Sequence, residues 1–159
     1  MNTNRLSFLG LQWWKWLCMA LLVYTVWEGF RVEVPRLPIL HETIRNLFFH
    51  VTMWFAMILL MIASLFYGIR YLRHGDWRDD IRASSCIHTG IFTGIIGLVT
   101  GSIWARFTWG AWWVNDAKLN GAAASMLVYF AYLVLRSSVE DEQKRGRITA
   151  VYSIFSFTL

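Results

Sequence analysis

Long uncharged stretches alternate with short charged clusters along this chain. No Asp, Glu, Lys or Arg occurs within residues 46–69 or within residues 83–105. Each stretch exceeds the roughly 20 apolar residues that a helix needs to cross a bilayer. The pattern therefore predicts two membrane-spanning helices, over about 46–69 and 83–105.

Three weaker stretches complete the pattern. An uncharged run over 119–135 lies near the lower limit of roughly 17 residues for a span and predicts another helix. The segment 6–27 is apolar apart from Gln12 and Lys15, and a lysine so near the start can extend to the headgroups, so a first span is expected there. The apolar run 148–159 is too short to cross lipid, and we expect it to be an incomplete fifth helix of a truncated chain.

The composition agrees with a membrane protein. Of the 159 residues, 57% are hydrophobic and 16% are charged, and the mean hydropathy is +0.43. We therefore expect an all-α fold, a polytopic bundle of transmembrane helices forming one domain over 1–159 and surrounded by lipid. The net charge of +5 does not indicate a nucleic-acid partner, because the cations flank apolar runs instead of lining a soluble face.

The cations are distributed unequally between the two sides of the predicted bundle. One side carries Arg5, Lys15, Arg70, Arg73, Arg78, Arg82, Arg136, Lys144, Arg145 and Arg147. The other side carries Arg31, Arg36, Arg45, Arg106 and Lys118. The positive-inside rule then predicts a cytoplasmic amino terminus, with the segments 28–45 and 106–118 facing outward.

Four glycines lie on one face of the helix expected over 83–105. They are Gly90, Gly94, Gly97 and Gly101. Spacings of four, three and four residues place them together on a helical surface, where a neighbouring helix can approach closely. We favour close packing as the role of this glycine face over a functional groove.

The end of that helix and the loop after it are unusually rich in tryptophan. The candidate functional residues there are Trp104, Trp109, Trp112, Trp113 and Asp116. One interpretation is an interfacial aromatic belt at headgroup level. The density of indole rings favours another, a stacking surface for a planar apolar ligand such as a tetrapyrrole. Asp116 could contact that ligand or cap the following helix, and both roles stay open.

The histidines differ in depth. His50 lies about one turn into the second span, at much the same level as the tryptophan-rich loop, and is a candidate axial ligand of haem iron; a plain hydrogen bond to a neighbouring helix is the alternative. His88 lies roughly 15 Å away in depth, so the two cannot share one iron. This argues against an electron-transfer cytochrome built on that pair, although His41 with His50 remains open. His74 is expected to be solvated.

The two cysteines do not indicate thiol chemistry. Cys18 and Cys86 lie inside apolar runs, and the chain has no C-x-x-C or C-x-x-C-H motif. Covalent attachment of haem is therefore not expected, and any haem would be a non-covalent b-type group.

Two sequence runs resemble a known family. Gly97-Leu-Val-Thr-Gly-Ser-Ile-Trp104 and Trp109-Gly-Ala-Trp-Trp-Val-Asn-Asp-Ala-Lys-Leu119 are similar to the tryptophan-rich signature of the CcmC family, haem exporter protein C, which functions in cytochrome c maturation. The signature reads approximately W-G-x-W-W-x-W-D-x-R-L. Phe49-His50-Val51 resembles the outward histidine segment of the same family.

The resemblance implies a six-helix protein of the bacterial cytoplasmic membrane that is not an enzyme. Such a protein holds haem on its outer face between the tryptophan-rich loop and two histidines. It passes the haem to a periplasmic haem chaperone, with subunits of an ABC-type transporter as companions. By the same resemblance, His50 would be the first iron ligand, and Trp109, Trp112, Trp113 and Asp116 would contact haem.

The match departs from the signature at several positions. Asn115 stands where tryptophan is usual, Lys118 replaces arginine and keeps only the charge, and Thr52 replaces proline. No histidine follows His88, so the second histidine ligand of the family is absent from the given sequence. A CcsA-type protein of the other maturation pathway is a close alternative, although its signature has a proline soon after the aspartate. A transporter or scaffold subunit without haem is the alternative from another class.

Overall fold

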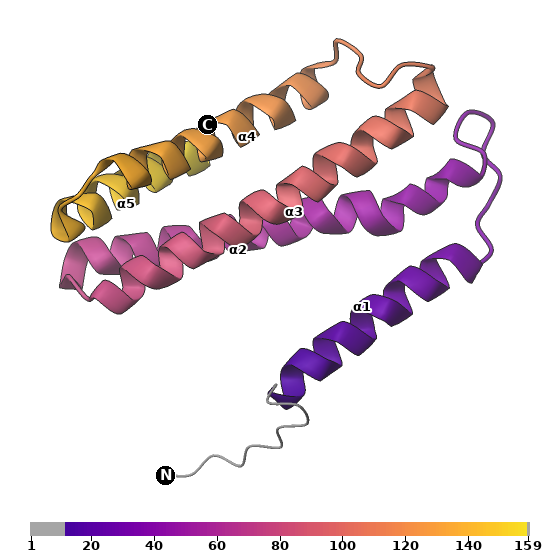
Figure 1. Ribbon diagram of the computed structural model, residues 1–159. Helices are drawn as coiled ribbons and strands as arrows, with labels where there is room; N and C mark the ends of the chain where they lie inside the picture. Colours follow the sequence, from indigo (N-terminus) through magenta and orange to yellow (C-terminus); the bar gives the residue numbers. More distant parts are fainter. Residues whose placement is uncertain (1–11, 159) are drawn as a thin grey trace. The chain divides into compact units, whose positions relative to one another are not determined.

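A computed structural model describes residues 12–158 of the chain, and these residues are mainly helical (Figure 1). The helices are α1 (Trp13–Arg31), the short 3-10 helix η1 (Glu42–Asn46), α2 (Leu47–His74), α3 (Trp77–Trp109), α4 (Ala117–Ser138) and α5 (Glu142–Thr158). Within the described residues there is no strand, and one isolated bridge joins Leu37 and His41. The predicted all-α fold is therefore confirmed.

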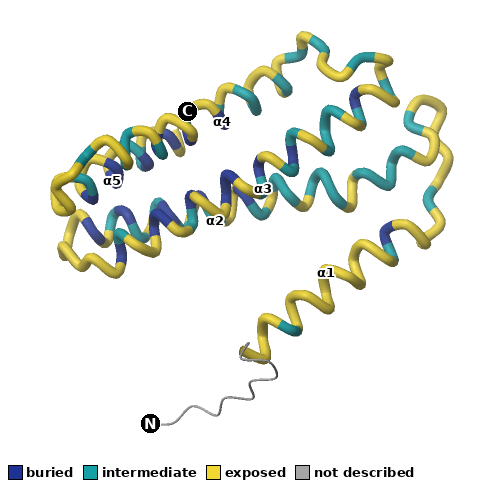
Figure 2. The backbone as a smooth tube through the Cα atoms, viewed as in Figure 1, coloured by how far each residue is buried: buried dark blue, intermediate teal, exposed yellow. Residues whose placement is uncertain are grey.

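The chain divides into two units, residues 1–45 and 46–159. The first unit contains α1 and the segment that follows it. Arg45 in this segment donates a hydrogen bond to the carbonyl oxygen of Gly29 at 3.2 Å, which ties the segment back to the end of α1. Figure 2 shows that α1 is exposed along most of its length, with Gly29 as its buried residue.

Among the described residues, three helices are long and apolar enough to cross a membrane: η1 with α2 over Glu42–His74, α3, and α4. Large apolar side chains on them remain exposed, including Leu59 (65%), Phe92 (64%) and Leu127 (67%). Exposed apolar surface on this scale suits contact with lipid. The span expected over 6–27 begins outside the described residues, and its described part forms α1, where Lys15 and Glu28 shorten the uncharged stretch.

The helices extend beyond the expected boundaries. The helix expected over 83–105 begins at Trp77, and the one expected over 148–159 begins at Glu142. An uncharged run marks only the part of a helix that lies in lipid. Charged residues can also form the first turn of a helix, so the helix can begin before the uncharged run. The side chain of Asp76 caps α3 by accepting a hydrogen bond from the backbone N–H of Arg78 at 2.9 Å.

The second unit consists of two antiparallel helix pairs, α2 with α3 and α4 with α5, and α5 also contacts α2 (Figure 1). Gly75 ends α2 with φ +70°, a conformation that glycine adopts without the strain of a side chain. We call the end that holds the 75–76 turn and the α4–α5 connection the charged end. The opposite end, with the start of α2 and the 110–116 loop, is the aromatic end.

The core of the second unit lies where methionine and tyrosine side chains meet the glycine face of α3. Its buried members are Met57, Met61, Ile87, Ile91, Met126, Tyr129 and Tyr132. A methyl group on Gly90 would lie 2.5 Å from Met61 Cε, and one on Gly94 would lie 2.5 Å from Met126 Sδ. The packing role predicted for the glycine face is confirmed, with neighbouring side chains filling the space that the glycines leave.

Ion pairs join the helices at the charged end. Asp79 is fully buried, and its carboxylate pairs with Arg70 of α2 at 3.1 Å and with Arg82 at 3.3 Å. The Arg136 guanidinium of α4 makes two hydrogen bonds to the Asp80 carboxylate, at 2.9 and 2.7 Å. A two-point contact of this kind fixes both the distance and the orientation of α3 and α4.

Replacing Asp80 by alanine should destabilise the second unit by about 3 kcal/mol, because Arg136, whose side chain is only 17% exposed, would lose its charged partner and keep only a hydrogen bond to the neutral Thr149 hydroxyl. Unfolding in detergent, followed by circular dichroism, measures this. Glu42→Ala is the control: it breaks the Arg36–Glu42 pair, whose side chains are 79% and 54% exposed, and should cost at most about 0.5 kcal/mol. Equal losses in the two variants would contradict this role of the Asp80–Arg136 pair.

Candidate functional site

His50 lies in the first turn of α2 at the aromatic end and is held against α3. Its Nδ1 atom lies 2.9 Å from the carbonyl oxygen of Gly97 and 3.3 Å from the hydroxyl of Thr100. The imidazole is half-buried in this position. Asn46 strengthens the same junction by donating a hydrogen bond from Nδ2 to the Thr100 carbonyl oxygen at 2.8 Å. The start of α2 is therefore fastened to α3 around the imidazole.

The hydrogen bond to Gly97 determines which nitrogen of His50 can bind a metal. A carbonyl oxygen only accepts hydrogen bonds, so Nδ1 must carry the proton. In the neutral imidazole the lone pair is then on Nε2. Histidines that ligate metals commonly donate their other N–H to a backbone carbonyl in this manner. His50 thus has the tautomer that an axial ligand of haem iron requires.

Two indole rings flank the imidazole. The His50 and Trp104 ring centroids are 5.9 Å apart with planes at 76°, and those of His50 and Trp54 are 6.2 Å apart with planes at 77°. Both arrangements are edge-to-face, as aromatic pairs prefer. Trp104 is among the site residues predicted from the sequence, whereas Trp54 is not. Its position four residues after His50, on the same helical face, is the signal that could have identified it.

The glycine face of α3 also provides the space for the imidazole. A methyl group on Gly101 would lie 2.6 Å from His50 Cε1, and one on Gly97 would lie 3.0 Å from the Trp54 ring. Both contacts would be closer than ordinary van der Waals contact. The glycine face therefore has a second role that the sequence analysis did not assign, because it admits the histidine and its neighbouring indole.

The tryptophan-rich loop begins where α3 ends. Trp109 is the last residue of α3, and Gly110 follows with φ +79° and a backbone hydrogen bond to the Arg106 carbonyl oxygen at 3.1 Å. The Arg106 guanidinium in turn donates to the Gly110 carbonyl oxygen. This left-handed residue ends the helix and redirects the chain. Trp109, Trp112 and Trp113 are 55%, 60% and 42% exposed, which leaves much of their surface for a ligand or for headgroups.

Polar contacts organise the second half of the loop. The Trp113 indole Nε1 donates to Asn120 Oδ1 at 3.2 Å, and Asn120 Nδ2 donates to Asn115 Oδ1 at 2.6 Å. Asp116 accepts a hydrogen bond from the backbone N–H of Lys118 at 2.8 Å and so caps α4. Of the two roles considered for Asp116, the structure shows the capping contact. Asn120 is a further residue that the sequence analysis missed.

The expected site residues share one end of the second unit. His50 and Trp104 are in ring contact, and Trp109 follows Trp104 by five residues, which corresponds to about 7.5 Å along the helix axis. Trp112, Trp113 and Asp116 lie in the loop that continues from there. Within this unit the chain therefore brings one imidazole and a group of exposed indoles to the aromatic end.

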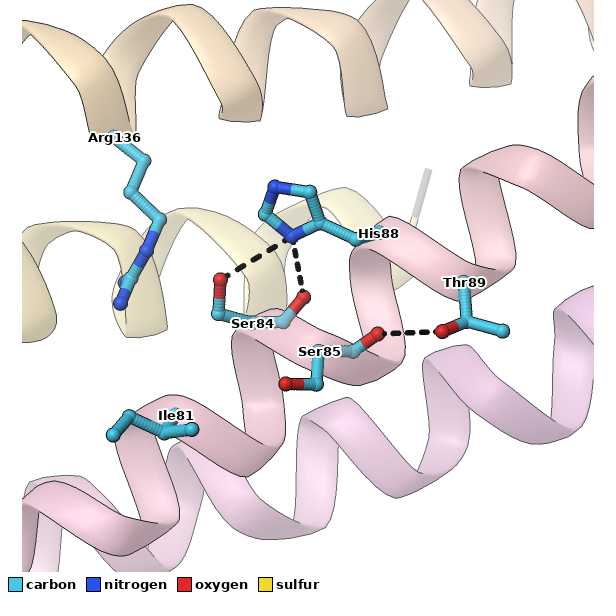
Figure 3. A pocket seen from close by; sticks show the side chains of 6 residues that line it. All are labelled: Ile81, Ser84, Ser85, His88, Thr89 and Arg136. Atoms are coloured by element: carbon cyan, nitrogen blue, oxygen red, sulfur yellow. Dashed lines mark hydrogen bonds between the residues drawn. The ribbon is translucent and has the colours of Figure 1, made fainter. Parts of the chain in front are cut away.

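His88 lies elsewhere on α3. Its Nδ1 atom is 2.8 Å from the Ser84 carbonyl oxygen, and it lines a cavity of about 400 Å³ together with Arg136 (Figure 3). Both residues lie in the halves of their helices that are nearer the charged end. His88 precedes Gly97, the partner of His50, by nine residues, or about 13.5 Å along the axis. The predicted separation in depth is confirmed, so these two imidazoles do not meet at one iron.

The remaining histidines are exposed. His74 ends α2 at the charged end, and His41 lies in the first unit with a left-handed backbone, φ +46°. Among residues 12–158, no three His, Cys, Asp or Glu side chains gather in a way that could hold a metal ion. Cys18 and Cys86 are both free thiols.

Comparison with known proteins shows which proteins this chain is similar to. The model of the CcmC family, heme exporter protein C, matches residues 2–158. The chain is 31% identical over 116 residues to heme exporter protein C of Bradyrhizobium diazoefficiens and 27% identical over 109 residues to that of Paracoccus denitrificans. It is also 42% identical over 82 residues to the cytochrome c biogenesis protein CcsA of a Prochlorococcus marinus strain.

These alignments cover most of this chain but less than half of its relatives. They include 70% and 69% of this chain against the two heme exporter proteins, and 52% against CcsA. They include 43%, 45% and 26% of the respective relatives. The chain thus spans less than half the length of the curated proteins that it matches.

Proposed function

Because this chain belongs to the haem exporter protein C (CcmC) family of cytochrome c biogenesis, we propose that it binds haem and presents it at the outer face of the membrane. Haem is the cargo in this proposal. The His50 imidazole supports it most directly, since Nδ1 is hydrogen-bonded to Gly97 and Nε2 is left as the ligating atom.

The indoles at the aromatic end suit the porphyrin plane. Trp104 lies beside the imidazole, and flat apolar surface is exposed by Trp109 at the end of α3 and by Trp112 and Trp113 on the loop that follows. Stacking on such rings, with axial ligation by His50, would hold haem without a covalent bond. We propose Asp116 as a further haem contact through the carboxylate oxygen that the capping hydrogen bond leaves free.

We propose that the aromatic end faces the periplasm of a bacterium and that the charged end faces the cytoplasm. Arginines gather at the charged end, where Arg70, Arg82 and Arg136 are held in ion pairs. The positive-inside rule assigns such an end to the cytoplasm. In this orientation the haem site is accessible to a periplasmic haem chaperone, while subunits of an ABC-type transporter are the proposed companions within the inner membrane.

The proposed task is binding and release, with no bond made or broken in the haem itself. An exposed group of indoles covers a ligand only partly, and a partly covered ligand can pass to a second protein. The CcsA likeness agrees with haem handling, but Ala117 and Lys118 follow Asp116 here without the proline of the CcsA-type signature. We therefore favour the CcmC pathway.

Titration of the purified protein with haemin tests the proposal. The wild type should develop a Soret band of a histidine-ligated haem, and a Trp112→Ala/Trp113→Ala variant should bind haemin about tenfold more weakly or worse, because two stacking contacts are lost. Trp77→Ala is the control, since Trp77 is 64% exposed but lies at the charged end. A wild type without a Soret band would refute haem binding, and crosslinking of its loop to a transporter subunit would then favour a scaffold role.

A further inference from the structure

We infer that Asn120 and Asn115 are positioning residues that hold the Trp113 indole in its haem-binding orientation, an inference that rests on the proposed function. The Trp113 Nε1–H donates to Asn120 Oδ1 at 3.2 Å, and Asn120 Nδ2 donates to Asn115 Oδ1 at 2.6 Å. We call these three side chains the amide relay. It joins the tryptophan-rich loop to the first turn of α4.

The chemistry of the relay determines the orientation of both amide groups. An indole N–H only donates hydrogen bonds, so the atom of Asn120 that faces Trp113 must be its oxygen. The NH2 group of Asn120 then faces Asn115, which must present its own oxygen. Each amide thereby satisfies the next, and no alternative assignment of the amide atoms preserves both contacts.

Asn120, the central residue of the amide relay, is held in place by helix α4. Asn120 lies in the first turn of α4, where its backbone N–H donates to the Asp116 carbonyl oxygen at 3.0 Å, and Asp116 caps the same helix. A side chain on a capped helix is better fixed than one on a free loop. The hydrogen bond to Asn120 therefore restrains the Trp113 side chain, although Trp113 itself lies in the irregular segment between α3 and α4.

The contact to Trp113 uses the edge of the ring. Because Nε1 lies on the perimeter of the indole, the hydrogen bond restrains the ring while leaving its faces free to stack. Trp113 is 42% exposed, so much of that surface is accessible. A bound porphyrin would also shield the relay from water, and hydrogen bonds strengthen in such surroundings. The relay should therefore matter most when haem is present.

Two measurements on the purified chain test the inference. In the haem-free protein labelled with 15N-indole tryptophan, the Trp113 N–H resonance, assigned by its loss in Trp113→Phe, should shift upfield and exchange faster with water in Asn120→Ala. With haemin bound, transfer to apomyoglobin should be about fivefold faster in Asn120→Ala, the factor that corresponds to one hydrogen bond of ordinary strength. Ser125→Ala is the control, because that hydroxyl donates to the carbonyl oxygen of Gly121 on its own helix.

Rescue and coupling separate positioning from general stability. Asn120→Asp should release haemin at close to the wild-type rate, since its carboxylate still accepts from Trp113 and the Asn115 amide can turn its NH2 group toward it. In a Trp113→Phe background, which keeps the aromatic ring and removes the donor, Asn120→Ala should add nothing. Both results would support the relay.

The outcomes also separate this inference from the proposed function. A wild-type Trp113 resonance and wild-type haemin release in Asn120→Ala would overturn the relay while leaving haem binding intact. An effect of Asn120→Ala that persists in the Trp113→Phe background would overturn it as well. A wild type that binds no haemin would overturn the proposed function, and with it the role of the relay in haem binding.

Discussion

His50→Ala is expected to lose the Soret band of histidine-ligated haem and to bind haemin at least on the order of 100-fold more weakly than the wild type. Changes to groups that merely orient a metal ligand cost 10- to 100-fold in metal affinity, so loss of the ligand itself should cost no less. His50 presents Nε2 because Nδ1 is hydrogen-bonded to the Gly97 carbonyl oxygen. Absorbance titration with haemin in detergent measures both effects.

The control for this experiment is the other intramembrane histidine of the second unit. His88→Ala removes an imidazole with the same kind of backbone hydrogen bond, to Ser84, but toward the charged end. Its Soret band and affinity should match those of the wild type. Added imidazole should restore the band in His50→Ala by occupying the vacated space beside Trp104. A wild-type spectrum in His50→Ala would show that the iron has another ligand.

The membrane-spanning helices could be predicted from the sequence because lipid imposes a simple requirement on composition. An uncharged apolar run of sufficient length has few alternatives to a transmembrane helix, and α2, α3 and α4 all satisfy this requirement. The ends of these helices are determined by capping residues and not by the length of the apolar run. The Asp76 cap lies in a charged segment, where apolarity carries no information, and α3 therefore begins before the uncharged run.

The contacts around the candidate site could be predicted only in part from the sequence. His50 and Trp104 were expected at one depth, because residues along a helix rise by a fixed 1.5 Å, and they are in ring contact. The amide relay could not be anticipated, since it depends on how the 110–116 loop folds back on α4. In the sequence, Asn115 stands where the family signature has tryptophan, which implies only the loss of an indole. In the structure it supports Asn120.

The glycine face shows how one sequence pattern can have two roles. Small residues at helical spacing predict close packing, and methionines pack against Gly90 and Gly94 as expected. Toward the aromatic end the same face receives Trp54 at Gly97 and the imidazole at Gly101. The packing of α2 on α3 and the placement of the proposed iron ligand are therefore parts of one interface. Haem affinity should therefore depend on Gly101, although this residue has no side chain that could contact haem.

Gly101→Ala is expected to weaken haemin binding by about 10- to 100-fold, because the added methyl group would lie 2.6 Å from His50 Cε1 and 3.1 Å from its Nδ1. The imidazole is hydrogen-bonded to Gly97, which lies on α3 like Gly101. It cannot move away from Gly101 while keeping that bond. A displaced Nε2 is a poorer axial ligand, so the Soret maximum should shift as well. Haemin titration and the spectrum of the saturated complex measure the two effects.

Gly121→Ala provides the matched control, since a methyl group there would meet nothing within 4 Å. Its affinity for haemin should equal that of the wild type, and α4 should gain up to about 1 kcal/mol of helix propensity. In a His50→Ala background, Gly101→Ala should have no further effect on haemin binding, because the group that it displaces is gone. Equal haemin affinities of Gly101→Ala and Gly121→Ala would contradict this account, and so would an undiminished effect of Gly101→Ala without His50, which would point to altered helix packing.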